Sequence, residues 1–190
     1  IESGSPNIKE LSQKMAITLI EQIDQLSKIA GDFSQFANIG NTKNERFDIN
    51  EVIVSLVNLY KAYPNLQISI GDLGGPSIID SDKLQFNRLL TNLIKNAVEA
   101  GENGPKPVNI YIGTRKEKSA VLIEVTDQSG GIAEQMTDHL FKPNFTTKSS
   151  GTGLGLAICK GIVEKSNGEI WYETRMGEGT SFFIRLPLAN

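Results

Sequence analysis

The sequence is poor in several residues that often define a protein class, with one cysteine, one histidine and one tryptophan among 190 residues. Because Cys159 is alone, an internal disulfide and a cysteine-ligated zinc site are both excluded, and its setting in LAICKGI predicts a small buried side chain. No apolar run is long enough to cross a bilayer, and residues 1–6 lack the basic and apolar parts of a signal peptide. These absences predict a reducing, cytoplasmic location.

A strong excess of either charge is also missing. The net charge of −3 and the isoelectric point near 5.3 indicate no basic surface for nucleic acid or for an anionic membrane, so neither partner is expected. A hydrophobic content of 39% is enough for one core with a smaller appendage. The chain does not begin with methionine, which predicts that it is part of a longer protein.

The first forty residues predict a long helix that needs a partner. Apolar residues recur there in alternating steps of three and four, and further apolar residues widen the stripe beyond the seam of a two-stranded coiled coil. The seam and its flanks comprise Ala16, Ile17, Leu19, Ile20, Ile23, Leu26, Ile29, Ala30, Phe33, Phe36 and Ala37. A bundle of several helices is therefore predicted. Since glycine and asparagine interrupt the pattern at 38–45, we assign residues 1–40 to this segment and 41–190 to a second domain.

The second domain mixes helices and strands. Helical patterns cover 48–60, 81–101 and 153–166, and strand patterns cover 66–72, 77–80, 108–117, 120–127, 168–175 and 180–188. Short turns join the last strands into hairpins, where parallel crossovers would need helices. The pattern predicts an α+β fold, a two-layer sandwich with helices on one face of a mixed sheet.

Two asparagines stand on the predicted helix 81–101. Asn92 and Asn96 lie four residues apart, at the edge between the apolar stripe and solvent. An isolated pair of this kind is most often two surface amides. Asparagine is a poor helix former, however, and a half-buried amide oxygen is a hard ligand that suits magnesium. The pair indicates a ligand site only in combination with other residues.

A carboxylate and several glycines complete the combination. Asp127 ends a strand just before Gly130 and Gly131, where it could accept a hydrogen bond from the exocyclic amine of adenine; guanine has a carbonyl there. The alternative is an ordinary Asp-Gly turn. The stretch GTGLGL at 151–156 frees backbone N–H groups at the start of a helix, which favours an anion such as phosphate. It matches neither the P-loop nor the dinucleotide fingerprint.

These motifs, in this order, resemble the ATP-binding catalytic domain of bacterial two-component sensor histidine kinases, in the GHKL superfamily. NLIKNA, DQSGGI, FKPNF, GTGLGL and GEGTSF are similar to the family's five sequence boxes over residues 46–190. The helix 8–39 resembles the second helix of the family's dimerisation and phosphotransfer hairpin. The resemblance implies the GHKL fold with ATP and magnesium as ligands.

The resemblance also implies roles for individual residues. Asn96 would bind magnesium and Asn92 would position phosphate or a ligand water, which makes these two the catalytic residues. Asp127 would bind the adenine amine, supported through water by Thr180. Residues 142–152 would form a lid, with Phe141 and Phe145 packed at its base. The implied nucleotide-binding set is Asn92, Lys95, Asn96, Asp127, Gly131, Thr146, Thr147, Lys148, Gly151, Thr152, Gly153, Leu154, Gly155 and Thr180.

The sequence departs from the family pattern at several positions. Ser129 replaces a usual glycine, Gln128 a usual asparagine and Glu99 a common lysine, so positive charge for phosphate must come from elsewhere. The only histidine, His139, lacks the acidic neighbour and the following proline of the phospho-accepting box. The acceptor histidine is therefore expected upstream of Ile1.

The resemblance implies transfer of the γ-phosphoryl group of Mg·ATP to that histidine, and then to an aspartate of a response-regulator receiver domain. It also implies a homodimer formed through the helical hairpin. Hydrolytic relatives of the gyrase or mismatch-repair kind carry a glutamate base where this chain has Asn92, and an amide cannot take that proton. A nucleotide-binding scaffold without transfer activity and a serine kinase of the anti-sigma type are the remaining alternatives.

Overall fold

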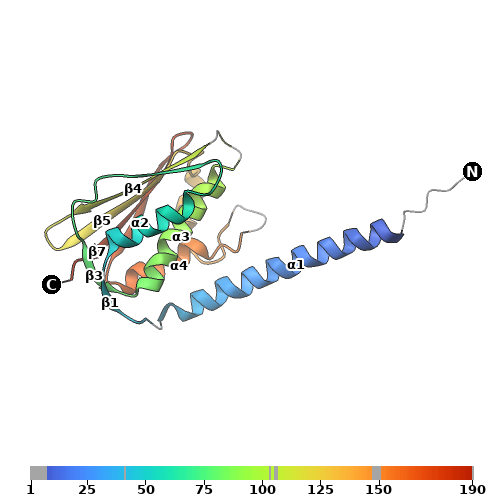
Figure 1. Ribbon diagram of the computed structural model, residues 1–190, viewed down its shortest axis with the longest axis horizontal. Helices are drawn as coiled ribbons and strands as arrows, with labels where there is room; N and C mark the ends of the chain where they lie inside the picture. The colour runs from blue at the N-terminus through green and yellow to red at the C-terminus, as the bar shows by residue number, and fades with distance from the viewer. Residues whose placement is uncertain (1–7, 41, 103, 105–106, 147–150, 190) are drawn as a thin grey trace, which may run out of the picture.

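A computed structural model describes residues 8–40, 42–102, 104, 107–146 and 151–189. Helix α1 (Ile8–Ala37) extends away from a sandwich of sheet and helices (Figure 1), and the 3-10 turn η1 (Asn38–Gly40) at its C-terminal end buries Ile39 against the sandwich. The predicted apolar stripe on α1 is largely exposed, with Leu26 and Phe33 each 65% accessible. Among the described residues, no helix combines the length and apolar character needed to cross a bilayer.

The sheet is mixed, as predicted. Its five strands lie in the order β2-β4-β5-β7-β6, and the pair β2–β4 is parallel while the other pairs are antiparallel. The strands are β2 (Leu66–Ile70), β4 (Val108–Lys116), β5 (Ala120–Asp127), β6 (Glu169–Arg175) and β7 (Gly179–Pro187). The parallel pair requires a crossover, which helix α3 provides between β2 and β4. The β5–β7 register places Asp127 opposite Thr180, which brings two predicted site residues together.

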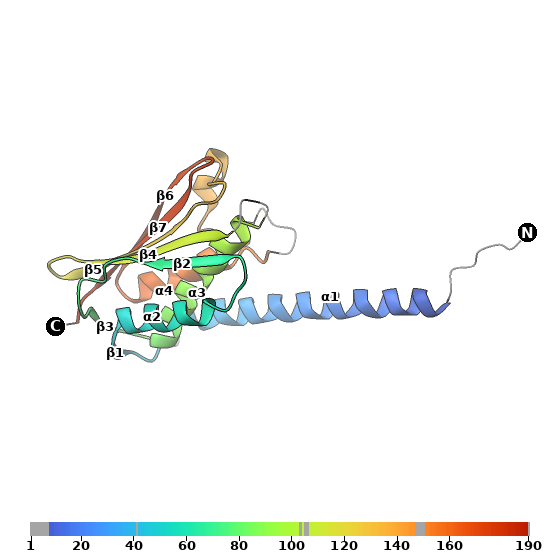
Figure 2. The ribbon, with the colours of Figure 1, turned by 45° about the horizontal axis from the view of Figure 1, so that its top comes forward.

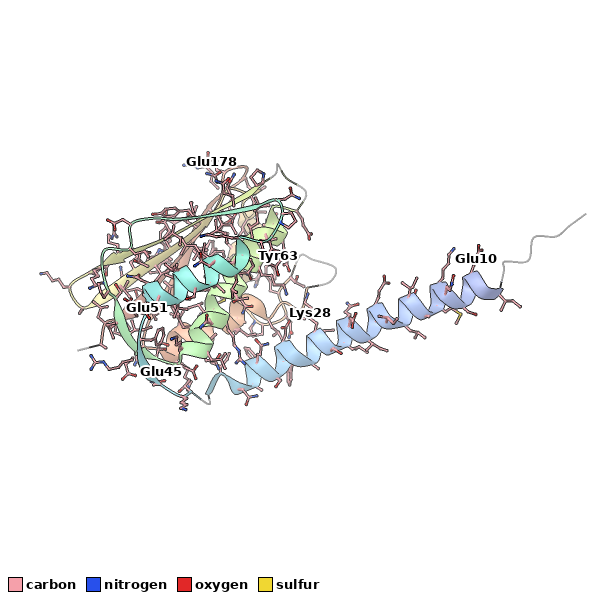
Figure 3. The ribbon with its side chains drawn as sticks, in the orientation of Figure 1. Glu10, Lys28, Glu45, Glu51, Tyr63 and Glu178 are labelled. Atoms are coloured by element: carbon pink, nitrogen blue, oxygen red, sulfur yellow. The ribbon has the colours of Figure 1, made fainter. Side chains whose placement is uncertain are left out.

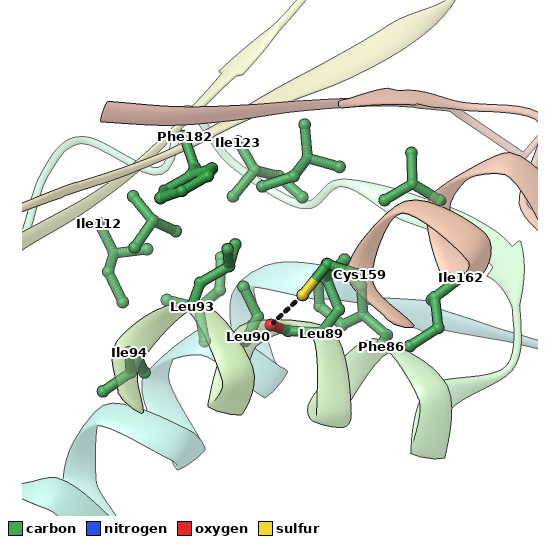
Figure 4. Packing of buried hydrophobic residues seen from close by; sticks show 14 of the residues in the cluster. Phe86, Leu89, Leu90, Leu93, Ile94, Ile112, Ile123, Cys159, Ile162 and Phe182 are labelled. Carbon is green, nitrogen blue, oxygen red and sulfur yellow. Dashed lines mark hydrogen bonds between the residues drawn. The ribbon is translucent and has the colours of Figure 1, made fainter. Parts of the chain in front are cut away.

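Three helices cover one face of this sheet: α2 (Ile49–Tyr60), α3 (Lys83–Ala100) and α4 (Gly155–Lys165) (Figure 2). The apolar stripe of α3 is fully buried between the sheet and the other two helices. Phe86, Leu89, Leu90, Leu93 and Ile94 are each at most 1% exposed and pack against Ile112, Ile123, Cys159, Ile162 and Phe182 (Figure 4). The α+β sandwich with helices on one face is therefore confirmed.

The helix ends follow local sequence. Asp48 caps α2 by accepting from the Asn50 N–H, and Asp82 caps α3 by accepting from the Gln85 N–H, so the positive ends of both helices receive a carboxylate. The order Asp48-Ile49-Asn50-Glu51 predicts a capping box in which Asp48 would accept from the Glu51 N–H, but the cap bond comes from the Asn50 N–H. Helix α4 begins at Gly155, two residues later than predicted.

Two elements were not predicted. Strand β1 (Glu45–Asp48) pairs antiparallel with β3 (Ile78–Ser81) in a separate two-stranded sheet, and η2 (Glu134–His139) is a 3-10 helix after β5. The division of the chain at residues 40 and 41 stays a prediction.

Candidate nucleotide site

A cavity of about 460 Å3 opens between α3, the segment after β5 and the glycine segment before α4. This volume lies in the range of small-molecule sites. Most of the predicted site residues line it, although they come from separate parts of the chain: Asn92, Lys95, Asn96, Asp127, Gly131, Thr146, Gly151, Thr152, Gly153, Gly155 and Thr180. Thr147 and Lys148 lie outside the described residues.

Leu154 is not brought to the cavity. Its side chain is 6% exposed within the hydrophobic core, where the residue forms the N-terminal boundary of α4. The nucleotide-binding role expected of Leu154 is therefore not supported by its side chain, because a leucine at the start of an amphipathic helix gains most by packing inward.

Asp127 is held at the floor of the cavity. It is 5% exposed, and its Oδ1 accepts both the Ser129 N–H, at 3.0 Å, and the Ser129 hydroxyl. Burial raises the pKa of the Asp127 carboxyl above its ordinary value, although donors from Ser129 and the Thr180 N–H oppose the shift. A carboxylate has two oxygens with about four acceptor positions, so it can still accept a donor from a ligand.

The turn between β6 and β7 lies close against the backbone of Asp127 and of the segment after it. Gly179 has a φ of +118°, and a Cβ there would lie 2.0 Å from the Asp127 carbonyl oxygen. Gly131 has a φ of +73°, and its Cβ would lie 2.4 Å from the Arg175 carbonyl oxygen. Both positions therefore require glycine for conformation and for close approach.

Thr180 contacts both Asp127 and Thr174, and the water-mediated support expected of it stays a prediction. Its hydroxyl lies 3.0 Å from that of Thr174, and its backbone N–H is the group that donates to Asp127. Thr174 also accepts from the Ile132 N–H at 2.9 Å. The two threonines thus join the segment after β5 to the β6–β7 hairpin beside Asp127.

The asparagine pair faces the cavity from α3. Asn92 donates weakly to the Gly155 carbonyl, at 3.4 Å, and so connects α3 to the start of α4. Asn96 has a buried Nδ2 without a hydrogen-bond partner among the described residues. A buried amide N–H left unpaired costs free energy in the folded state, and an acceptor such as a water molecule or a phosphate oxygen would satisfy it.

Gly153 and Gly155, at the start of α4, have different roles. Gly153 has a φ of +66°, and a Cβ there would lie 2.6 Å from the Asn144 carbonyl carbon. A Cβ at Gly155 would meet no atom within 4 Å, although Gly155 lines the cavity. Gly153 is needed by the fold, whereas Gly155 leaves open space at the N-terminus of α4. That end has no side-chain cap, so its N–H groups and dipole suit an anion.

Several cavity residues were not expected from the sequence. Phe145 lines the cavity, whereas Phe141 packs against Tyr172 and Phe182 as predicted for the base of the segment. Lys28 and Asp32 of α1 also line the cavity. No local signal marks Lys28 and Asp32, because their position depends on how α1 lies against the domain.

His139 does not contribute to this cavity. It is exposed on η2, where its Nδ1 lies 2.9 Å from the Lys142 ammonium and its ring lies beside Phe145. Cys159 is fully buried, and burial raises the pKa of its thiol to about 12, so it is an inert core residue as predicted.

The donor set fits Mg·ATP. An amide oxygen of Asn96 is a suitable hard ligand for magnesium, Asp127 can accept from an exocyclic amine, and the uncapped N-terminus of α4 offers N–H groups to a phosphate. The sheet, the covering helices and this cavity together define a nucleotide-binding α/β sandwich.

The particular family follows from comparison with known proteins. The chain belongs to the family of histidine kinase-, DNA gyrase B-, and HSP90-like ATPases, whose model matches residues 81–190, more than half of the chain. It is 31% identical over 186 residues to Sporulation kinase D of Bacillus subtilis (strain 168), covering 93% of this chain and 35% of that protein.

Solved structures agree with this assignment. The nucleotide-free catalytic domain of histidine kinase ThkA superposes with a TM-score of 0.68 at 29% identity, over 77% of this chain and 96% of that domain. ThkA in complex with the response regulator TrrA has a TM-score of 0.75 at 24% identity, over 98% of this chain and 53% of that one, which shows a shared fold. The chain is thus an ATP-binding domain of the histidine kinase type.

Proposed function

We propose that this domain transfers the γ-phosphoryl group of Mg·ATP to a histidine outside this chain, and that an aspartate of a response-regulator receiver domain then receives it. The observation that carries the proposal is the pairing, in one cavity, of a buried acceptor for adenine, Asp127, with the amide Asn92 where hydrolytic relatives have a base. An amide cannot take a proton from water at neutral pH, so the site favours transfer to an external nucleophile.

Different residues along the cavity would bind the adenine, the magnesium ion and the phosphates. Asp127 orients the adenine, and the Ser129 donors hold its carboxylate in one rotamer. Magnesium, when bound, would neutralise charge on the phosphates, and Asn96 is the residue we expect to hold it. Asn92 lies against Gly155, at the N-terminus of α4, where it would position the phosphate chain. Such positioning and charge stabilisation supply most of the catalysis of phosphoryl transfer.

The partners are part of the same proposal. The exposed apolar stripe of α1 suits burial against another helix of a dimerisation hairpin. A receiver domain as acceptor is suggested by the ThkA complex with its response regulator. A cytoplasmic location stays a prediction from the family resemblance.

Two measurements test the proposal. Calorimetric titration of the chain with Mg·ATP should give binding in the micromolar to millimolar range, without steady release of inorganic phosphate. The longer protein that contains this chain should form acid-labile, base-stable phosphohistidine. Steady phosphate release by the chain would favour a hydrolytic ATPase instead. ATP binding without any phosphohistidine in the longer protein would favour a nucleotide-binding scaffold.

A further inference from the structure

The last turns of α1 and the following turn η1 contact the ATP-binding domain at three separate places. Asp32 accepts a hydrogen bond from the Thr152 hydroxyl, at 2.6 Å, across 120 residues of sequence. Phe36 packs against the hydrophobic core, and Ile39, 8% exposed, lies against Gly161 on α4. Asp32 and Phe36 lie four positions apart on one face of α1, and Ile39 follows in η1.

Lys28 stands one turn before Asp32 on this face and lines the nucleotide cavity. It is half-buried, whereas its neighbours on either side are exposed. Figure 3 shows Lys28 on the stretch of α1 that passes the segment before α4. Thr152, which Asp32 contacts, belongs to the glycine segment expected to bind phosphate, so Lys28 approaches the phosphate end of the cavity.

The described cavity lining carries little positive charge to balance a bound triphosphate. Within the described lining, the cations are Lys28 and Lys95, against the carboxylates of Asp32, Glu99 and Asp127. Lys95 lies 4.0 Å from Glu99, and its side chain is 50% exposed. A triphosphate is strongly anionic, and binding it in a lining where carboxylates outnumber lysines requires nearby positive charge.

We propose that Lys28 of α1 is a phosphate-binding residue of the nucleotide site, and that the Asp32–Thr152 hydrogen bond positions the helix for this contact. The inference rests on the proposed use of ATP. The helix is then part of the ATP site as well as a connection between segments. By linkage, ATP would favour the docked position of α1 as much as docking favours ATP.

Nucleotide titrations of the full chain test this role. We expect Lys28→Gln to raise the Kd for ATP roughly tenfold at low salt, since a charge-assisted contact is lost from a partly exposed site. The Kd for AMP should change little, because AMP lacks the β- and γ-phosphates. Lys28→Arg should retain most of the affinity. Lys14→Gln, which removes a lysine from the exposed part of the same helix, is the matched control.

The outcomes separate the proposal from its alternatives. An unchanged Kd for ATP in Lys28→Gln would overturn it, and so would an equal loss for ATP and AMP, which would indicate a structural role. If the unsubstituted chain binds neither nucleotide, the proposed ATP-dependent function itself fails. Circular dichroism would verify that each variant keeps its fold, and in Lys28→Gln the salt dependence of ATP binding should be shallower.

A second substitution tests the positioning role of Asp32. In a chain carrying Asp32→Ala, the further change Lys28→Gln should have a much smaller effect on the Kd for ATP, because the helix is no longer held at the cavity. A full additional loss in the double variant would show that Lys28 does not depend on the Asp32–Thr152 contact.

Discussion

Replacement of Asp127 by asparagine gives the sharpest test of the proposed adenine contact. Both Ser129 donors go to the same carboxylate oxygen, Oδ1, so an asparagine would keep its own oxygen there. Its NH2 group would then stand where the second carboxylate oxygen lies. A donor would face the exocyclic amine of adenine, whereas the six-position carbonyl of guanine could accept from it.

The expected loss can be estimated from the contact. A hydrogen bond to a charged group contributes about 1.5–3 kcal/mol, which corresponds to about 10- to 150-fold in Kd. Because Asp127 is 5% exposed and a donor replaces an acceptor, we expect the upper part of that range for ATP. GTP should bind the variant as well as, or better than, the unsubstituted chain.

Calorimetric titration with ATP and GTP measures both effects, with Asp80→Asn as control because Asp80 is exposed on β3. Equal losses for ATP and GTP would refute the reasoning, since they would indicate a damaged fold. An unchanged ATP affinity would show that Asp127 does not contact the base.

The raised pKa of Asp127 adds a pH dependence with a definite sign. The carboxylate should lose its acceptor role as the pH falls through this raised value, so ATP binding should weaken there in the unsubstituted chain and not in Asp127→Asn. For stability, the raised pKa means a contribution fully present below the unfolded value of about 3.9 and lost as the pH rises through the folded pKa. Thermal unfolding across pH 3–7, with this variant for comparison, would measure that step.

Three further predictions concern the same domain. Asn96→Ala should weaken binding of Mg·ATP more than binding of metal-free ATP, without lowering Tm, and titrations with and without magnesium would measure this. Asp82→Ala should reduce the free energy of unfolding by about 0.5–2 kcal/mol at pH 7. Burial would raise the pKa of Asp82, but backbone donors outweigh it and lower the pKa, so the difference should shrink as the pH falls below about 3.9. Gly155→Ala should weaken ATP binding and leave Tm unchanged. Gly153→Ala should weaken ATP binding and also lower Tm, because its Cβ would meet the Asn144 backbone at 2.6 Å. Equal effects of the two substitutions on Tm would contradict this reasoning.

The helices were predictable because their signals are local. The apolar stripe of α3 and the aspartate that caps α2 lie within a few residues of the structure they produce. Strand β1 was missed because its four residues carry no alternation of their own and are strands only through pairing with β3.

The candidate site was predictable for the same reason, to the extent that short motifs carry it. Asn92 and Asn96 are one helical turn apart, and Asp127 with Gly131 lies within one turn, so their spacing in the sequence already implies a shared face or loop. Leu154 was assigned to the nucleotide because the whole motif was carried over, while the structure turns its side chain into the core.

The sequence by itself determined the α+β class. It also determined the asparagine pair on α3, the carboxylate at the end of β5 and the glycines around the start of α4, because each depends on neighbours close along the chain. Only the tertiary structure decided that Lys28 and Asp32 lie at the cavity. It also decided that Gly179 lies so close to the Asp127 carbonyl oxygen that no Cβ fits between them. The Asp32–Thr152 hydrogen bond joins residues 120 positions apart. Such contacts arise from how helices and hairpins pack, and a local pattern carries no information about them.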